Sequence, residues 1–72
     1  MSKEVDARGL SCPQPVLMAL NEMKTMGKGE LVILVDTDTS KENVGRAAEI
    51  QGWTIKEIRA EGNEYRIAIA KE

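Results

Sequence analysis

A single cysteine, Cys12, is the residue of this sequence with the clearest capacity for chemistry. It lies in the run Gly-Leu-Ser-Cys-Pro-Gln-Pro-Val, residues 9–16, directly before a stretch with helical spacing. Cysteine reacts as its thiolate, and a helix N-terminus favours that charged form. Pro13 and Pro15 mark the helix start, because proline is tolerated in a first turn and damaging further in. We therefore expect an exposed sulfur whose pKa lies below that of a free thiol.

Two residues compete for the N-cap position of this helix. Cys12 is the cap if Pro13 takes the first helical position, whereas Ser11 is the cap if Gln14 completes a capping box. The first assignment is favoured, because a residue before proline adopts the extended geometry of an N-cap. The sulfur would then accept a hydrogen bond from the Gln14 N–H at the positive end of the helix dipole. The competing interpretation is a buried, inert side chain, the commoner role of a lone cysteine.

Composition limits the other chemistries. The 72 residues suffice for one small domain, residues 1–72, with no room for a second. The sequence contains no histidine, so no imidazole can activate the thiol and no Cys/His set can hold zinc. We expect no metal and no cofactor. The net charge of −2 and the 3% aromatic content count against nucleic-acid binding.

The same features indicate the compartment. One cysteine cannot form an internal disulfide, which counts against a secreted disulfide scaffold. No apolar run has the length of a membrane span, and residues 1–8 are too polar for a signal peptide. We therefore expect a cytoplasmic protein with no membrane partner.

The first part of the sequence predicts a strand followed by a helix. Residues 3–6 form a short strand, and Arg8 and Gly9 turn out of it. Residues 13–26 form a helix that ends at Gly27, with an apolar face at helical spacing made by Val16, Ala19, Leu20 and Met23. Met18 points away from that face, one turn above Cys12, and is a candidate for docking a partner.

The rest of the sequence predicts a second strand, a second helix and two further strands. Residues 31–35 are a continuous apolar run, typical of a central strand covered on both faces. Asp36 and Asp38 then read as a solvated loop, and Thr39 with Glu42 fits a capping box for a helix that ends at Gly52. Residues 53–60 form a third strand with a bulge or an edge location. A hairpin of type II′ geometry, residues 61–64, leads into the last strand.

The element order is therefore β-α-β-α-β-β. A strand-helix-strand unit implies a parallel pair, and the final hairpin adds antiparallel strands. We predict an α/β (α+β) fold: a two-layer sandwich in which two helices cover one face of a mixed four-stranded sheet. The open face carries Lys56, Arg66 and Ala68. The order of the strands does not follow from the sequence.

The segment from Asp6 to Val16 closely resembles the signature of the TusA/SirA-like sulfur carrier family, which is Gly-Leu, one residue, then Cys-Pro-x-Pro. The resemblance extends to the element order and the length. It implies that Cys12 carries sulfur as a persulfide. The donor would be a cysteine desulfurase or another sulfurtransferase, and the acceptor an unknown protein. The remaining motif residues would shape the site, namely Pro13, Gln14 and Pro15 at the helix start and Asp6, Arg8 and Gly9 in the preceding turn.

The destination of the sulfur stays open. Residues 43–46, Asn-Val-Gly-Arg, look more like the YedF-like branch of the family, which is associated with selenium metabolism. Transfer RNA thiolation and cofactor sulfuration are the other destinations that the resemblance implies. The main rival function is a thiol redox or regulatory protein acting through mixed disulfides, although a resolving cysteine is lacking. A third is an RNA-binding module, against which the charge and the sparse aromatics count.

Overall fold

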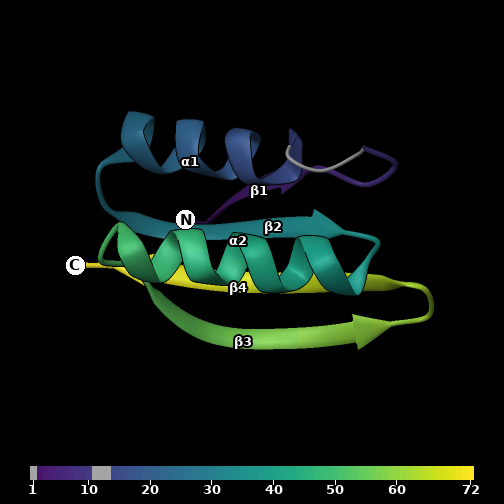
Figure 1. The fold of residues 1–72 in the computed structure, drawn as a ribbon. Helices are drawn as coiled ribbons and strands as arrows, with labels where there is room; N and C mark the ends of the chain where they lie inside the picture. Colours follow the sequence, from purple (N-terminus) through teal and green to yellow (C-terminus); the bar gives the residue numbers. More distant parts are fainter. Residues whose placement is uncertain (1, 11–13) are drawn as a thin grey trace.

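A computed structural model describes residues 2–10 and 14–72 of the chain. The elements in sequence order are β1 (Ser2–Asp6), α1 (Gln14–Met26), β2 (Gly29–Val35), α2 (Asp38–Ile50), β3 (Thr54–Glu61) and β4 (Glu64–Lys71). Both helices lie on one face of the sheet and leave the other face open (Figure 1). The predicted two-layer α/β sandwich with the order β-α-β-α-β-β is confirmed.

The sheet has the strand order β1-β2-β4-β3. β1 pairs with β2 in parallel, whereas β4 runs antiparallel to both β2 and β3. The sheet is therefore mixed, as predicted, with β2 and β4 at its centre. One consequence matters for the site: β1 and β2 end at the same edge of the sheet, and β4 begins there.

The core lies between the helices and the inner face of the sheet. Val5, Ile33 and Ile67 are neighbours across β1, β2 and β4, and all three are buried. β2 is covered on its other face as well, as its apolar run predicted, because Val32 is only 7% exposed. On that face Arg66 of β4 donates to Glu4 of β1 over 3.0 Å, so this ion pair crosses β2 beside Val32.

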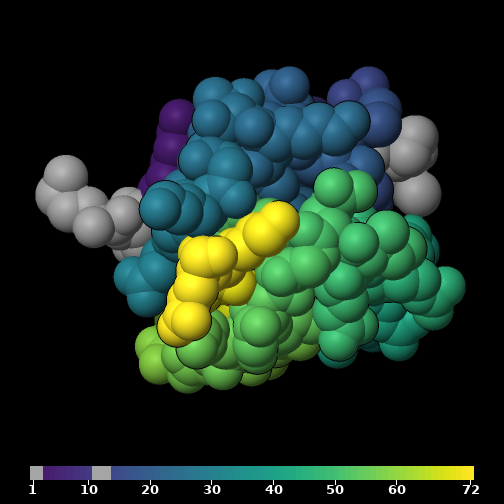
Figure 2. Space-filling model, turned by 90° about the vertical axis from the view of Figure 1, so that its left-hand side faces the viewer, coloured from purple at the N-terminus to yellow at the C-terminus, as the bar shows by residue number. Residues whose placement is uncertain are grey.

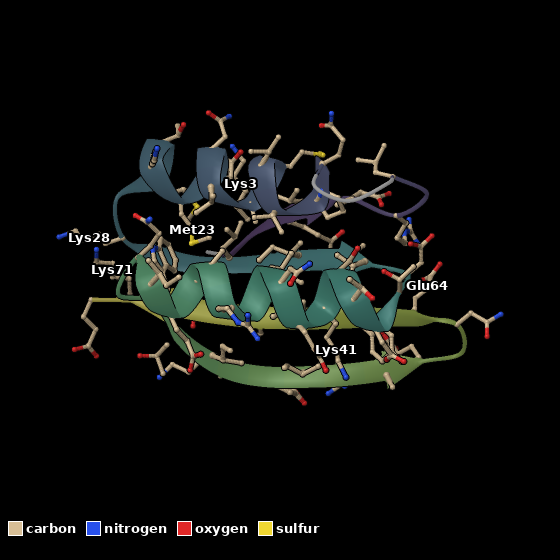
Figure 3. All side chains as sticks on the ribbon, in the orientation of Figure 1. Lys3, Met23, Lys28, Lys41, Glu64 and Lys71 are labelled. Atoms are coloured by element: carbon tan, nitrogen blue, oxygen red, sulfur yellow. The ribbon has the colours of Figure 1, made fainter. Side chains whose placement is uncertain are left out.

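The buried face of α1 is centred on Pro15, Ala19 and Met23, which recur at intervals of four residues. In Figure 3, Met23 points into the space between α1 and the sheet. Gly27 has φ +76° and donates its N–H to the Met23 carbonyl over 2.9 Å, which confirms the predicted end of the helix.

The predicted orientation of Met18 was wrong. Its side chain is partly buried and packs against the core cluster, as do Val16 and Leu20. The reason is that the buried face is centred on Ala19, so that Met18 and Leu20 lie on its two flanks. The large apolar side chain of α1 that is exposed is instead Leu17, at 52%.

The N-cap of α2 also differs from the prediction. Thr37 is the cap: its backbone is extended, and its side-chain oxygen accepts the Ser40 N–H over 3.0 Å. The capping box predicted at Thr39 and Glu42 was therefore two residues too late. Several Thr and Asp residues follow β2, and each is a favourable N-cap. Thr37 takes the position because its extended backbone directly precedes the first helical residue.

α2 approaches the sheet closely, through a face of small residues. Val44, Ala47 and Ala48 are buried, and so is Gly45. A Cβ on Gly45 would lie 3.2 Å from the Cδ1 of Ile55, so the absence of a side chain permits this approach to β3. After Ile50 the chain turns through Gly52, whose φ is +86°.

The last two strands confirm the predicted irregularity. β3 is at the edge of the sheet, and its pairing with β4 shifts register between Ile55 and Glu57, which is a β-bulge. The strand begins one residue later than predicted, since Trp53 is buried ahead of it and donates its N–H to the Ala48 carbonyl. Gly62 has φ +62°, which suits the first central position of the predicted type II′ turn.

Candidate functional site

The residues that flank the Cys12 motif lie at the edge where the two parallel strands end. β1 ends at Asp6, β2 ends at Val35, and the N-cap of α2 at Thr37 follows two residues later. In open α/β sheets, ligands bind at the carboxyl ends of such strands. Ser11, Cys12 and Pro13 themselves lie outside the described residues, so the two competing N-cap assignments stay predictions.

The guanidinium of Arg8 is held by two carboxylates. It forms a two-pronged contact with Asp6, from Nε to Oδ1 over 2.9 Å and from Nη2 to Oδ2 over 2.7 Å. Its Nη1 donates to both oxygens of Glu64, over 3.0 and 3.1 Å. Paired contacts of this kind fix the plane of a guanidinium as well as its position. Two carboxylates face one guanidinium, so the three side chains together carry a formal charge of −1. The positive charge of Arg8 is therefore fully compensated.

The backbone that leads toward the motif is held at three successive N–H groups. The Ala7 N–H donates to the Leu34 carbonyl over 2.9 Å, and the Arg8 N–H donates to Asp6 Oδ1 over 3.1 Å. The Gly9 N–H donates to Asp36 Oδ2 over 2.8 Å. Gly9 has φ +76°, a backbone conformation that residues with a Cβ atom rarely adopt. The turn predicted at Arg8 and Gly9 is therefore present and is anchored to the end of β2.

Hydrogen bonds from the side chain and the backbone of Arg8 lower the pKa of Asp6 from 3.8 to about 2. We expect NMR titration of the Asp6 carboxyl to give a midpoint near pH 2, because Arg8 favours the charged form. The folded-state pKa is depressed, so the stabilising contribution is fully present above pH 3.8 and is lost as the pH falls toward 2. Arg8→Gln should return the midpoint toward 3.8. A midpoint that Arg8→Gln leaves unchanged would show that another group causes the shift.

A second polar cluster lies beside this edge. The Tyr65 hydroxyl donates to the Asp38 carboxylate, and this bond raises the pKa of the phenol. The Lys41 ammonium lies 4.7 Å from the centre of the Tyr65 ring and 3.8 Å from an Asp38 oxygen. Asp38 is thus engaged with its neighbours. Within residues 2–10 and 14–72, no group of three or more His, Cys, Asp and Glu side chains is arranged to hold a metal ion.

The structure brings together only some of the residues that the motif singled out. Asp6, Arg8 and Gly9 form the anchored turn. Pro15 lies in the first turn of α1, as predicted, but it is fully buried, whereas Gln14 is exposed. The other candidate, Met18, is partly buried against the core, and its role in docking a partner stays a prediction.

Two residues of this edge were not identified from the sequence. Asp36 was interpreted as part of a solvated loop, yet it accepts the Gly9 N–H. A signal for it existed, because Asp36 follows a strand parallel to β1 and the ends of parallel strands meet. Glu64 carried no such signal, since it is 56 residues from Arg8 and the order of the strands was unknown.

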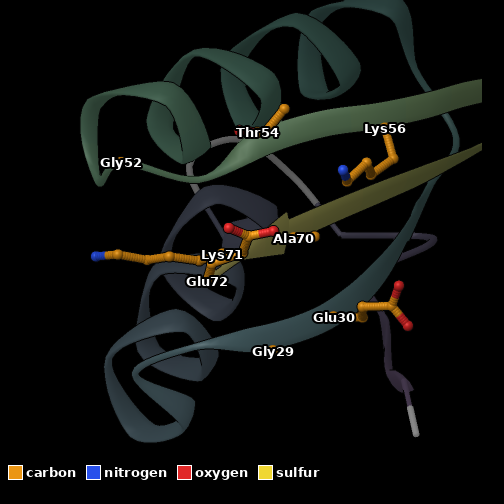
Figure 4. Close-up of a pocket in the computed structure, with 8 residues that line it drawn as sticks. All are labelled: Gly29, Glu30, Gly52, Thr54, Lys56, Ala70, Lys71 and Glu72. Carbon is orange, nitrogen blue, oxygen red and sulfur yellow. The ribbon is translucent and has the colours of Figure 1, made fainter.

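A hollow of the described surface lies at the opposite end of the sheet from the anchored turn. It has a volume of about 530 Å³ and is lined by Gly29, Glu30, Gly52, Thr54, Lys56, Ala70, Lys71 and Glu72 (Figure 4). Figure 2 views this end of the molecule, where the C-terminal residues lie at the surface. The lining holds two lysines and two glutamates, and Lys71 donates to the Gln51 carbonyl. The hollow therefore favours neither sign of charge and is remote from the anchored turn.

Neither α1 nor α2, the helices within the described ranges, is long and apolar enough to cross a membrane.

Comparisons with known proteins give a consistent result. The family described as Sulfurtransferase TusA matches residues 3–71. The chain is 31% identical to the sulfur carrier protein TusA of Allochromatium vinosum, over 96% of this chain and 92% of that protein. It is 33% identical to a putative sulfur carrier protein of Methanocaldococcus jannaschii, over 96% and 93%. The crystal structure of a SirA-like protein from Desulfitobacterium hafniense is similar with a TM-score of 0.86, at 30% identity, over 94% and 95%.

Proposed function

Because this chain belongs to the TusA family of sulfur carrier proteins, we propose that Cys12 is the residue that carries the sulfur, as a persulfide. The observation that carries the proposal is the family match over residues 3–71, which includes the only cysteine of the sequence. The anchored turn supports it, since residues 7–9 are held at the edge of the sheet three residues before the thiol. We propose that residues 1–72 form a single domain of this family.

The transfer is an exchange between sulfurs. The Cys12 thiolate attacks the outer sulfur of a persulfide on the donor protein, and a new S–S bond forms at Cys12. The S–S bond of the donor breaks, and the donor sulfur leaves as a thiolate. No net oxidation takes place, because one persulfide is consumed and one is formed. The second transfer repeats the step, with an acceptor thiolate attacking the outer sulfur on Cys12.

We further propose a cysteine desulfurase or another sulfurtransferase as the donor, a protein acceptor, and a cytoplasmic location. Transfer RNA thiolation, cofactor sulfuration and selenium metabolism are the destinations to be distinguished. Capture of partners by a persulfide-loaded chain, followed by their identification, separates these routes. The rival redox function predicts instead a disulfide-linked complex that forms under peroxide without any sulfur donor.

The test is to incubate the protein with a cysteine desulfurase and cysteine and to measure its intact mass. We expect one added sulfur atom, removed again by a thiol reductant. Protein whose thiol has first been alkylated with iodoacetamide should gain none. Absence of the adduct on the untreated protein, or an equal adduct on the alkylated protein, would reject the proposal.

A further inference from the structure

The turn before the motif is tied to three strands, one of which lies far away in the sequence. In the strand order β1-β2-β4-β3, β1 and β4 are not neighbours, because β2 lies between them. Arg8, two residues beyond the end of β1, nevertheless contacts Glu64, the first residue of β4. The Arg8 side chain therefore reaches across the end of β2. In Figure 3, Glu64 lies at the same end of the molecule as the loop of residues 7–10, whereas Lys28 and Lys71 lie at the other end.

Three carboxylates hold the turn of residues 7–9, and each comes from a different part of the chain. Asp6 acts from within the turn, through the side chain and the N–H of Arg8. Asp36 acts from the end of β2, through the N–H of Gly9. Glu64 is the only one of the three that joins the turn to the β3–β4 hairpin. Without it, nothing among the described hydrogen bonds connects residues 7–9 to that hairpin.

We infer that Glu64, acting through Arg8, is a positioning residue for the segment that leads into Cys12. It holds the Arg8 guanidinium across the end of β2 and so restricts the orientations that residues 7–9 adopt. The inference rests on the proposed function in one respect, namely that the segment it positions carries the reacting thiol. Sulfur transfer between two proteins depends on orientation, and small displacements of a reacting group slow such steps markedly.

The pair is suited to positioning more than to global stability. The side chain of Arg8 is 40% exposed and that of Glu64 is 45% exposed. Exposed ion pairs contribute little to the stability of a whole domain. Glu64→Gln should therefore leave the fold and its melting temperature nearly unchanged. A matched control is Glu57→Gln, which removes a carboxylate that pairs with Arg59 on β3 over 3.1 Å at similar exposure.

The first measurement is amide hydrogen exchange by NMR in the Cys12→Ser chain, which requires no sulfur chemistry. Glu64→Gln is expected to raise the exchange rates of the Arg8 and Gly9 amides by about two- to fivefold, with the core strands unchanged. In an Arg8→Gln background the same substitution should add nothing, because its partner is already absent. Glu57→Gln should leave both amides at their original rates. Unchanged rates in Glu64→Gln, or equal acceleration by Glu57→Gln, would overturn the inference.

The second measurement is the rate of sulfur acceptance by the chain that retains Cys12. Glu64→Gln should slow transfer from a persulfide-bearing desulfurase several-fold, while alkylation of Cys12 by iodoacetamide changes by less than about twofold, since a small reagent needs no fixed orientation. Unchanged transfer would overturn the positioning role even if the amides exchange faster. If the wild-type chain accepts no sulfur at all, the proposed function fails, whereas the exchange experiment still decides whether Glu64 holds the segment.

Discussion

Replacement of Cys12 by serine is expected to abolish sulfur acceptance completely. A hydroxyl cannot form the S–S bond that holds the transferred sulfur, and the sequence has no second cysteine to take over. Serine is close to cysteine in size and is a favourable N-cap residue, so the substitution should leave the free energy of unfolding within about 0.5 kcal/mol of the wild type. Intact mass after incubation with desulfurase and cysteine measures the first effect, and urea denaturation measures the second.

A matched variant tests whether the position of the thiol matters, or only the presence of a thiol in this segment. Ser11→Cys combined with Cys12→Ser keeps one cysteine and moves it by one residue along the motif. We expect this chain to accept far less sulfur than the wild type, because its thiol no longer stands at the position that we propose for sulfur transfer. An equal adduct on Cys12→Ser would refute the assignment of the sulfur to Cys12. Equal loading of the exchanged chain would show that any thiol in this segment suffices.

The second large effect concerns the core. Ile67→Ala should cost about 2–5 kcal/mol, because Ile67 is fully buried on the central strand β4 and its removal leaves a cavity. A domain of this size buries only about 60% of its unfolded surface, so its total stability is modest. A loss of about 3 kcal/mol would lower the melting temperature by roughly 12–24 °C.

Ile58→Ala is the control for this prediction. Ile58 lies opposite Ile67 in the register of β3 and β4, but its side chain is 44% exposed. The same chemical change should therefore cost less than about 1 kcal/mol, as is usual away from the core. Fluorescence of Trp53, the single and buried tryptophan, reports unfolding of both variants in urea. Equal losses in the two variants would mean that burial in the sheet does not determine the cost.

The sequence by itself determined the elements and the family. The predicted ends of each helix and strand differ from the observed ends by about two residues or fewer. The signals behind them, namely apolar periodicity, glycines and prolines, act over a few residues. The parity change between Ile55 and Ile58 predicted a bulge or an edge location, and β3 has both. The motif around Cys12 predicted the family, since its residue types and spacing are contiguous in the chain.

Only the tertiary structure decided which distant residues meet. The strand order β1-β2-β4-β3 brings the start of β4 to the edge where β1 and β2 end, and thereby places Glu64 against Arg8. It also set the flank on which Met18 packs and the residue, Thr37, that caps α2. The physical reason is common to all three. Local propensity specifies how a segment folds, but the partners of a side chain depend on how segments far apart in the sequence pack together.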